Sequence, residues 1–161
     1  MATAAAFPFI GTWQRVCTVS NLGSFAPVPD SRYYVVVEAA EGQPQTYTWR
    51  FGERLDALRV GYTTTLAPGA AAAGTGAGGG SSPGVAFTPM LVTCGVGSGS
   101  AALRTDGSVF TLTLLQPSGL LATVVYRVLD PDTLAVSITE VPERCETATV
   151  STGFLFKVPG A

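Results

Sequence analysis

The sequence predicts an all-β fold, a closed antiparallel up-and-down barrel of about eight to ten strands. Apolar and polar residues alternate with a period of two, as in strands that have one buried and one solvated face. Turn-forming residues separate these segments, for example at 41–44 and 130–133. No stretch shows a capped helical stripe. Closure into a barrel is favoured because it removes exposed sheet edges, and a β-sandwich is the alternative.

The alternation assigns each expected strand a face toward the interior. Tyr47, Trp49 and Phe51 interleave with polar residues in one segment, and Phe110 and Leu112 do so in a later one. The expected strands span residues 11–20, 33–39, 45–51, 54–64, 85–93, 108–115, 121–129, 133–141 and 146–158.

The length of 161 residues fits a single domain over residues 1–161. Residues 67–83 are almost wholly small and polar, which predicts a flexible Ala/Gly-rich loop inserted between two strands. Residues 74–79 match the Gly-x-Gly-x-x-Gly pattern inside this loop. A dinucleotide site needs that pattern between a strand and a helix, so no cofactor is expected.

The composition narrows the classes of partner. Net charge is −2 and the nine basic residues are scattered singly, which argues against nucleic acid as a partner. Apolar runs are too short for a transmembrane helix. Residues 1–6 lack the features of a secretory signal, so we expect a cytoplasmic protein, with a cilium as a further possible location. Only 12% of residues are charged, which favours an apolar outer surface covered by a partner.

The residues that usually carry catalysis are scarce. The chain has no histidine, and its three cysteines are widely spaced, so we expect neither catalytic nor metal-binding residues. Arg15, Arg50 and Arg127 fall within expected strands. An inward arginine could pair with a ligand carboxylate through two parallel hydrogen bonds, whereas an outward arginine on a wet face is the commoner case.

Inward side chains of a small barrel form a packed core or line a ligand cavity. Core packing fully explains the aromatic row from Tyr47 to Phe51, and the wall of an apolar cavity is the alternative. The candidate lumen residues are Tyr47, Trp49, Phe51, Phe110, Leu112, Ile138 and Arg127.

The segment Phe9-Ile10-Gly11-Thr12-Trp13, at the start of a chain of strands, resembles the calycin group of lipocalins and fatty-acid-binding proteins. Residues 125–136 are similar to late hairpins of lipocalin-like proteins, and residues 153–158 are similar to their final strand. The resemblance implies a single lipocalin-like barrel.

The same resemblance implies how one end of the barrel is closed. Gly11 and Trp13 would lie at the closed end, and Lys157 or Arg127 would cover the indole through a cation–π contact.

Three functional hypotheses remain. The first is a non-catalytic structural or interaction subunit of a larger assembly, for instance in the cilium of a green alga, with other protein subunits as partners. The second is an intracellular lipocalin-like carrier of a small hydrophobic ligand. The third is a lyase or isomerase with its site in the barrel.

Overall fold

The computed structural model describes residues 7–20, 33–66, 86–95, 97–144 and 148–160, with the backbone alone over 16–20. The expected loop insertion at 67–83 lies outside the described residues. No helix in the described parts of the chain is long and apolar enough to cross a membrane.

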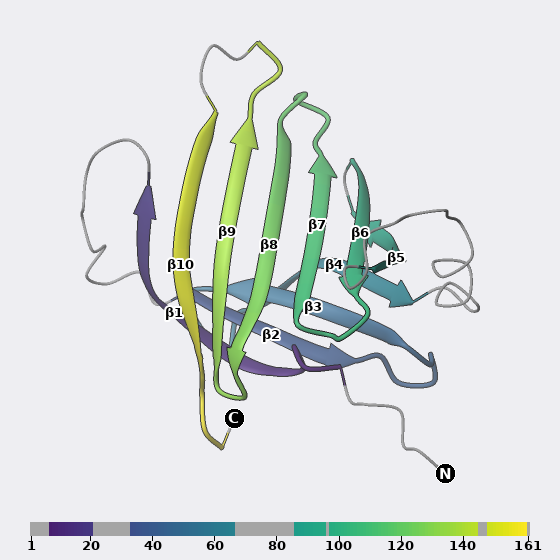
Figure 1. The fold of residues 1–161 in the computed structure, drawn as a ribbon, viewed down its shortest axis with the longest axis vertical. Coiled ribbons are helices and arrows are strands. Elements are labelled where there is room, and N and C mark those ends of the chain that lie inside the picture. The colour runs from purple at the N-terminus through teal and green to yellow at the C-terminus, as the bar shows by residue number, and fades with distance from the viewer. Residues whose placement is uncertain (1–6, 21–32, 67–85, 96, 145–147, 161) are drawn as a thin grey trace.

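Ten antiparallel strands close into one barrel, which confirms the predicted fold class and excludes the sandwich. Each strand pairs with its neighbours in sequence, and β1 also pairs with β10 to complete the ring (Figure 1). The strands are β1 (Gly11–Ser20), β2 (Tyr33–Ala39), β3 (Thr46–Gly52), β4 (Arg59–Leu66), β5 (Phe87–Cys94), β6 (Ser98–Arg104), β7 (Val109–Leu115), β8 (Leu121–Asp130), β9 (Thr133–Val141) and β10 (Thr149–Lys157).

Two strands differ from the sequence-based expectation. β6 was not among the expected strands, because its first residues, Ser98 to Ala101, are small and carry little β propensity. This segment is a strand because it pairs with β5 on one side and with β7 on the other. β4 begins five residues later than expected, since the preceding residues form a turn in which Arg54 and Asp56 make an ion pair at 2.6 Å.

Trp13 anchors the closed end of the barrel. Its side chain points inward and is 1% exposed, and its Nε1–H donates a hydrogen bond to the Phe9 carbonyl at 2.9 Å. The Lys157 ammonium lies 5.5 Å from the centre of the indole ring. Gly11 allows this approach, because a Cβ there would lie 3.0 Å from Lys157 Cε and its φ of +145° disfavours other residues. Lys157 therefore provides the basic cover over the indole.

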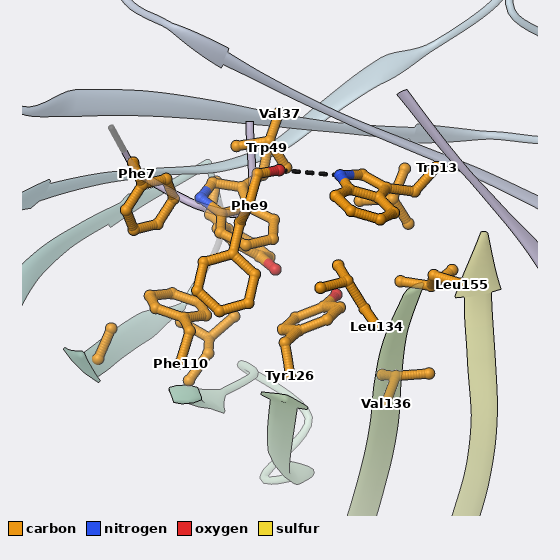
Figure 2. Packing of buried hydrophobic residues seen from close by; sticks show 14 of the residues in the cluster. Phe7, Phe9, Trp13, Val37, Trp49, Phe110, Tyr126, Leu134, Val136 and Leu155 are labelled. Atoms are coloured by element: carbon orange, nitrogen blue, oxygen red, sulfur yellow. Dashed lines mark hydrogen bonds between the residues drawn. The ribbon is translucent and has the colours of Figure 1, made fainter. Parts of the chain in front are cut away.

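The chain before β1 plugs this end. Phe9 is fully buried, with ring centroids 5.9 Å from Phe110 and 6.2 Å from Trp49 (Figure 2). Trp49 and Phe110 themselves stack across the interior at 4.8 Å, although they belong to β3 and β7. Phe7 stacks on Tyr47 at 4.0 Å farther toward the end. We call the part of the barrel that holds this aromatic cluster the plugged half.

Replacing Phe9 by alanine should lower the free energy of unfolding by about 3–5 kcal/mol, because the lost ring leaves a cavity among packed aromatics. Phe156→Ala is the matched control, since this ring lies on the outer face and is 44% exposed. It should cost less than about 1 kcal/mol. Urea denaturation measures both values, and equal losses would show that Phe9 is not part of the core.

Candidate ligand site in the barrel lumen

Beyond the aromatic cluster, the lumen is lined by apolar side chains that remain partly exposed. Val124 and Ile138 lie opposite each other on β8 and β9, and both belong to the inward-facing rows of their strands. Their inward neighbours Leu114, Val92 and Cys94 are also only half-buried. Incomplete burial of inward side chains means that this half of the lumen is accessible to solvent. We call it the open half.

The Arg15 side chain places a positive charge inside the barrel. It lies two residues after the buried Trp13 and therefore shares its inward face. Its backbone pairs with Tyr33 on β2 and with Leu155 on β10. The guanidinium carbon lies 4.9 Å from the centre of the Tyr33 ring. In the described part of the chain, the Arg15 guanidinium makes no ion pair.

Two tyrosine side chains are buried inside the barrel. Tyr62 and Tyr126 are 5% and 4% exposed. Burial raises the pKa of Tyr62 well above its usual value and raises the pKa of Tyr126 to about 12. The Arg15 charge acts in the opposite direction and lowers the pKa of Tyr126. Burial also raises the pKa of Tyr33, again partly offset by Arg15. The Arg15 charge therefore acts on the phenols of Tyr33 and Tyr126.

The Tyr62 hydroxyl is buried without a hydrogen-bond partner among the described residues. The Tyr126 phenol is the polar group next to it, and the interaction between the two hydroxyl groups raises the pKa of Tyr62 and lowers that of Tyr126. Leaving a buried hydroxyl unpaired costs about 1–3 kcal/mol. Such a cost is typical of a site whose partner is supplied by something other than the protein.

The structure divides the lumen candidates from the sequence into three groups. Trp49, Phe110 and Leu112 are buried in or against the aromatic cluster, so they form the floor of the open half. The Trp49 indole nitrogen donates to the Thr64 hydroxyl at 3.0 Å. Tyr47 lies at the plugged end, stacked on Phe7. Phe51 and Ile138 face inward and are half-buried, as the wall of a cavity requires.

Arg127 does not belong to the lumen. Tyr126 takes the inward position on β8, so alternation directs Arg127 to the outer face, where it is exposed. There it borders a hollow of about 230 Å³, whose floor is formed by Ala135 and Ser137 of β9. Arg50 also lies outside, 3.7 Å from Glu38. Arg15 is therefore the inward arginine among the three that the sequence placed in strands.

Two further hollows flank the stacked Phe7 and Tyr47 rings at the plugged end. Their volumes are about 620 and 410 Å³, and turn residues such as Gln45 border both. The larger one lies against the turn between β2 and β3. The smaller one is lined by inward-facing residues such as Leu66, Met90 and Leu103, so it opens from this end of the barrel interior. Among the described residues, no three His, Cys, Asp or Glu side chains gather where they could hold a metal ion.

Sequence reasoning missed the importance of Arg15, Tyr62 and the plug formed by Phe7 and Phe9. A signal for Arg15 exists in the sequence, because an inward Trp13 implies an inward residue two positions later. No comparable signal identifies the plug, since Phe7 and Phe9 precede the first strand and bend across its end, with Ile10 N donating to the Phe7 carbonyl.

Comparisons with known proteins give structural matches only. No protein-family model matches the chain, and no curated protein does. The S-type phycobiliprotein lyase CPES from Guillardia theta aligns with a TM-score of 0.53 at 10% identity, over 96% of this chain and 90% of that one. A DUF3598-family protein of unknown function from Nostoc punctiforme aligns with a TM-score of 0.54 at 9% identity, over 94% of this chain and 48% of that one.

A third structure, EF1p2_mFAP2b bound to DFHBI, aligns with a TM-score of 0.44 at 12% identity, over 96% of this chain and 97% of that one. At identities this low, the first two likenesses show the fold alone. The chain is thus a ten-stranded barrel of the calycin-like fold.

Stability should fall as the pH rises from about 10 to about 12. Tyr126 ionises near pH 10 in the unfolded chain but at about 12 in the folded barrel. The unfolded state therefore loses its proton first, and ionisation favours unfolding in this window. The ionisation of Tyr126 alone should lower the free energy of unfolding by about 2–3 kcal/mol across this pH range. Urea denaturation at each pH should show a shallower decline for Tyr126→Phe. An unchanged decline would mean that the Tyr126 phenol is not buried.

Proposed function

We propose that the open half of the lumen binds a small, predominantly apolar molecule. The observation that carries this proposal is the partial exposure of inward apolar side chains, among them Leu114, Val124 and Ile138. These side chains leave apolar surface inside the barrel in contact with water. An apolar ligand that covers this surface removes it from water, which lowers the free energy and favours binding.

The polar groups around this surface support the same proposal. Ligand cavities are mostly apolar, with a few polar groups that fix the orientation of the ligand. Arg15 and the unpaired Tyr62 hydroxyl fit that description. The calycin-like fold also serves a phycobiliprotein lyase in another organism, so a functional barrel of this kind has a precedent.

Filling the open half with protein should abolish binding. N-phenyl-1-naphthylamine, a neutral dye that fluoresces in apolar surroundings, is a suitable probe. Leu114→Trp adds bulk to the inward face of β7 and should weaken binding at least roughly tenfold. Leu115→Trp is the matched control, because Leu115 is the next residue on the same strand and is 47% exposed. Its titration should match that of the wild-type protein.

Two outcomes would contradict the proposal. The first is a wild-type titration in which the dye does not bind. The second is equal weakening by Leu114→Trp and Leu115→Trp, which would place the dye on the outer surface.

A second candidate function is a subunit of a larger assembly. Phe154 and Phe156 lie on the outer face of β10 and are 43% and 44% exposed, and Leu129 at the end of β8 is 51% exposed. Exposed apolar residues that gather on one face favour a contact with another protein. Location in the cytoplasm or a cilium stays a prediction.

Native mass spectrometry of the protein purified from its source separates the two candidates. A small-molecule adduct supports the carrier, whereas additional protein chains support the subunit. Phe154→Ser should release such chains and leave a small-molecule adduct in place.

We propose no reaction for the lumen. The third hypothesis, a lyase or isomerase, expects an inward carboxylate or arginine with a shifted pKa. Among the described residues, the inward groups with shifted pKa values are instead phenols, and Tyr62 and Tyr126 remain protonated near neutral pH. Phenols in that state act as hydrogen-bond donors rather than as general bases.

A further inference from the structure

A groove runs along β9 on the outer face of the barrel. β9 lies between β8 and β10 (Figure 1). Leu134 and Val136 of β9 point into the core, so the residues that alternate with them point outward. These outward residues are small, namely Thr133, Ala135, Ser137 and Thr139. The outward side chains of the two flanking strands are larger and form the walls of the groove.

The register of the strands sets the large side chains opposite each other. Ala135 pairs with Arg127 on one side and with Phe154 on the other. Phe156 pairs with Thr133 one step farther along, and both phenylalanines are exposed. The hollow of about 230 Å³ lies at this point of the groove. An apolar cavity of about 150 Å³ holds a benzene molecule, so the hollow has room for one large apolar side chain.

The groove carries one charge. Its outward positions belong to residues 123–127 of β8, 133–139 of β9 and 152–156 of β10. Arg127 is the one charged residue among them, and its guanidinium makes no ion pair in the described part of the chain. Asp130 and Asp132 lie at the β8–β9 turn, where an Asp130 carboxylate oxygen accepts the Asp132 backbone N–H. Arg127 therefore remains available to a carboxylate from another molecule.

The floor of the groove favours a peptide over an alkyl chain. It carries the hydroxyl groups of Thr133, Ser137 and Thr139. An alkyl chain would cover these hydroxyls without forming hydrogen bonds, which costs free energy, whereas the N–H and C=O groups of a peptide can pair with them. The β9 backbone is already paired with β8 and β10, so the occupant contacts side chains and does not join the sheet.

We propose that this groove binds an extended segment of another protein, in which a large apolar side chain fills the hollow and a neighbouring aspartate or glutamate pairs with Arg127. The groove is roughly 20 Å long from Thr133 to Thr139, which matches about seven extended residues. This inference goes beyond the ligand in the lumen. It rests on the second candidate function and specifies the kind of partner that the outer face takes.

Selection from random heptapeptides displayed on phage tests the chemistry of the partner. Peptides enriched on the full-length protein should carry an acidic residue next to a large apolar one. Selection on Arg127→Glu should enrich lysine or arginine in place of the acidic residue, because the charge of the groove is reversed. No enrichment on the wild-type protein, or the same peptides from both selections, would overturn the proposal.

Binding of one enriched peptide then locates the site. The synthetic peptide carries fluorescein, and its fluorescence polarisation gives the Kd. Ser137→Phe fills the floor of the groove and should raise the Kd at least roughly tenfold. Ser100→Phe is the matched control, because this exposed serine pairs with β5 and β7, away from the groove. It should change the Kd less than about twofold. Equal weakening by both substitutions would overturn the assignment to the groove.

Salt gives a separate readout of Arg127. Arg127→Gln should raise the Kd of the peptide about tenfold at low ionic strength, since a charge-assisted hydrogen bond is lost. The difference between this variant and the wild-type protein should shrink as NaCl is added, because salt screens exposed charges. A difference that does not depend on salt would contradict the ion pair.

Two further measurements separate this inference from the functions proposed above. Ser137→Phe and Arg127→Glu should bind N-phenyl-1-naphthylamine as the wild-type protein does, since both positions lie outside the lumen. Dye binding without any enriched peptide would overturn the groove and leave the lumen proposal standing, and the converse result would overturn the lumen proposal alone. In native mass spectrometry, partner chains that stay bound to Arg127→Glu would support the subunit but overturn the groove as its contact.

Discussion

The hydrogen bond from the Trp13 indole to the Phe9 carbonyl determines how the barrel is divided. It holds the chain that precedes β1 across one end, where Phe9 fills the space between Trp49 and Phe110. A barrel of ten strands with nothing at this end would be open on both sides. On the far side of the aromatic cluster, inward apolar side chains are only half-buried. Arg15 faces that space as the next inward residue of β1.

The two halves differ in how completely their side chains are packed and hydrogen-bonded. In the plugged half, apolar rings pack in direct contact and the Trp49 indole nitrogen finds the Thr64 hydroxyl. In the open half, the Tyr62 hydroxyl has no described partner, and inward aliphatic residues such as Ile138 keep contact with solvent. Stability alone would favour phenylalanine at position 62, since an unpaired buried hydroxyl lowers stability.

The alternation of residues in the sequence predicted antiparallel strands, because a period of two specifies one inward face for each strand. The choice of a barrel over a sandwich came from the cost of exposed sheet edges. The alternation did not predict β6, because its small residues show no such pattern. This segment forms a strand because it pairs with β5 and β7. The position of Arg127 could have been inferred, since an inward Tyr126 places the next residue outside. The state of the Tyr62 hydroxyl could not, because it depends on how the closed barrel places Tyr126 of β8 beside Tyr62 of β4.

The central claim is that the open half of the barrel binds a small, predominantly apolar molecule. A crystal structure of the protein with N-phenyl-1-naphthylamine tests it most directly. The account predicts that the dye lies inside the barrel against Val124 and Ile138. A dye molecule in the outer hollow beside Arg127, with none inside the barrel, would contradict it.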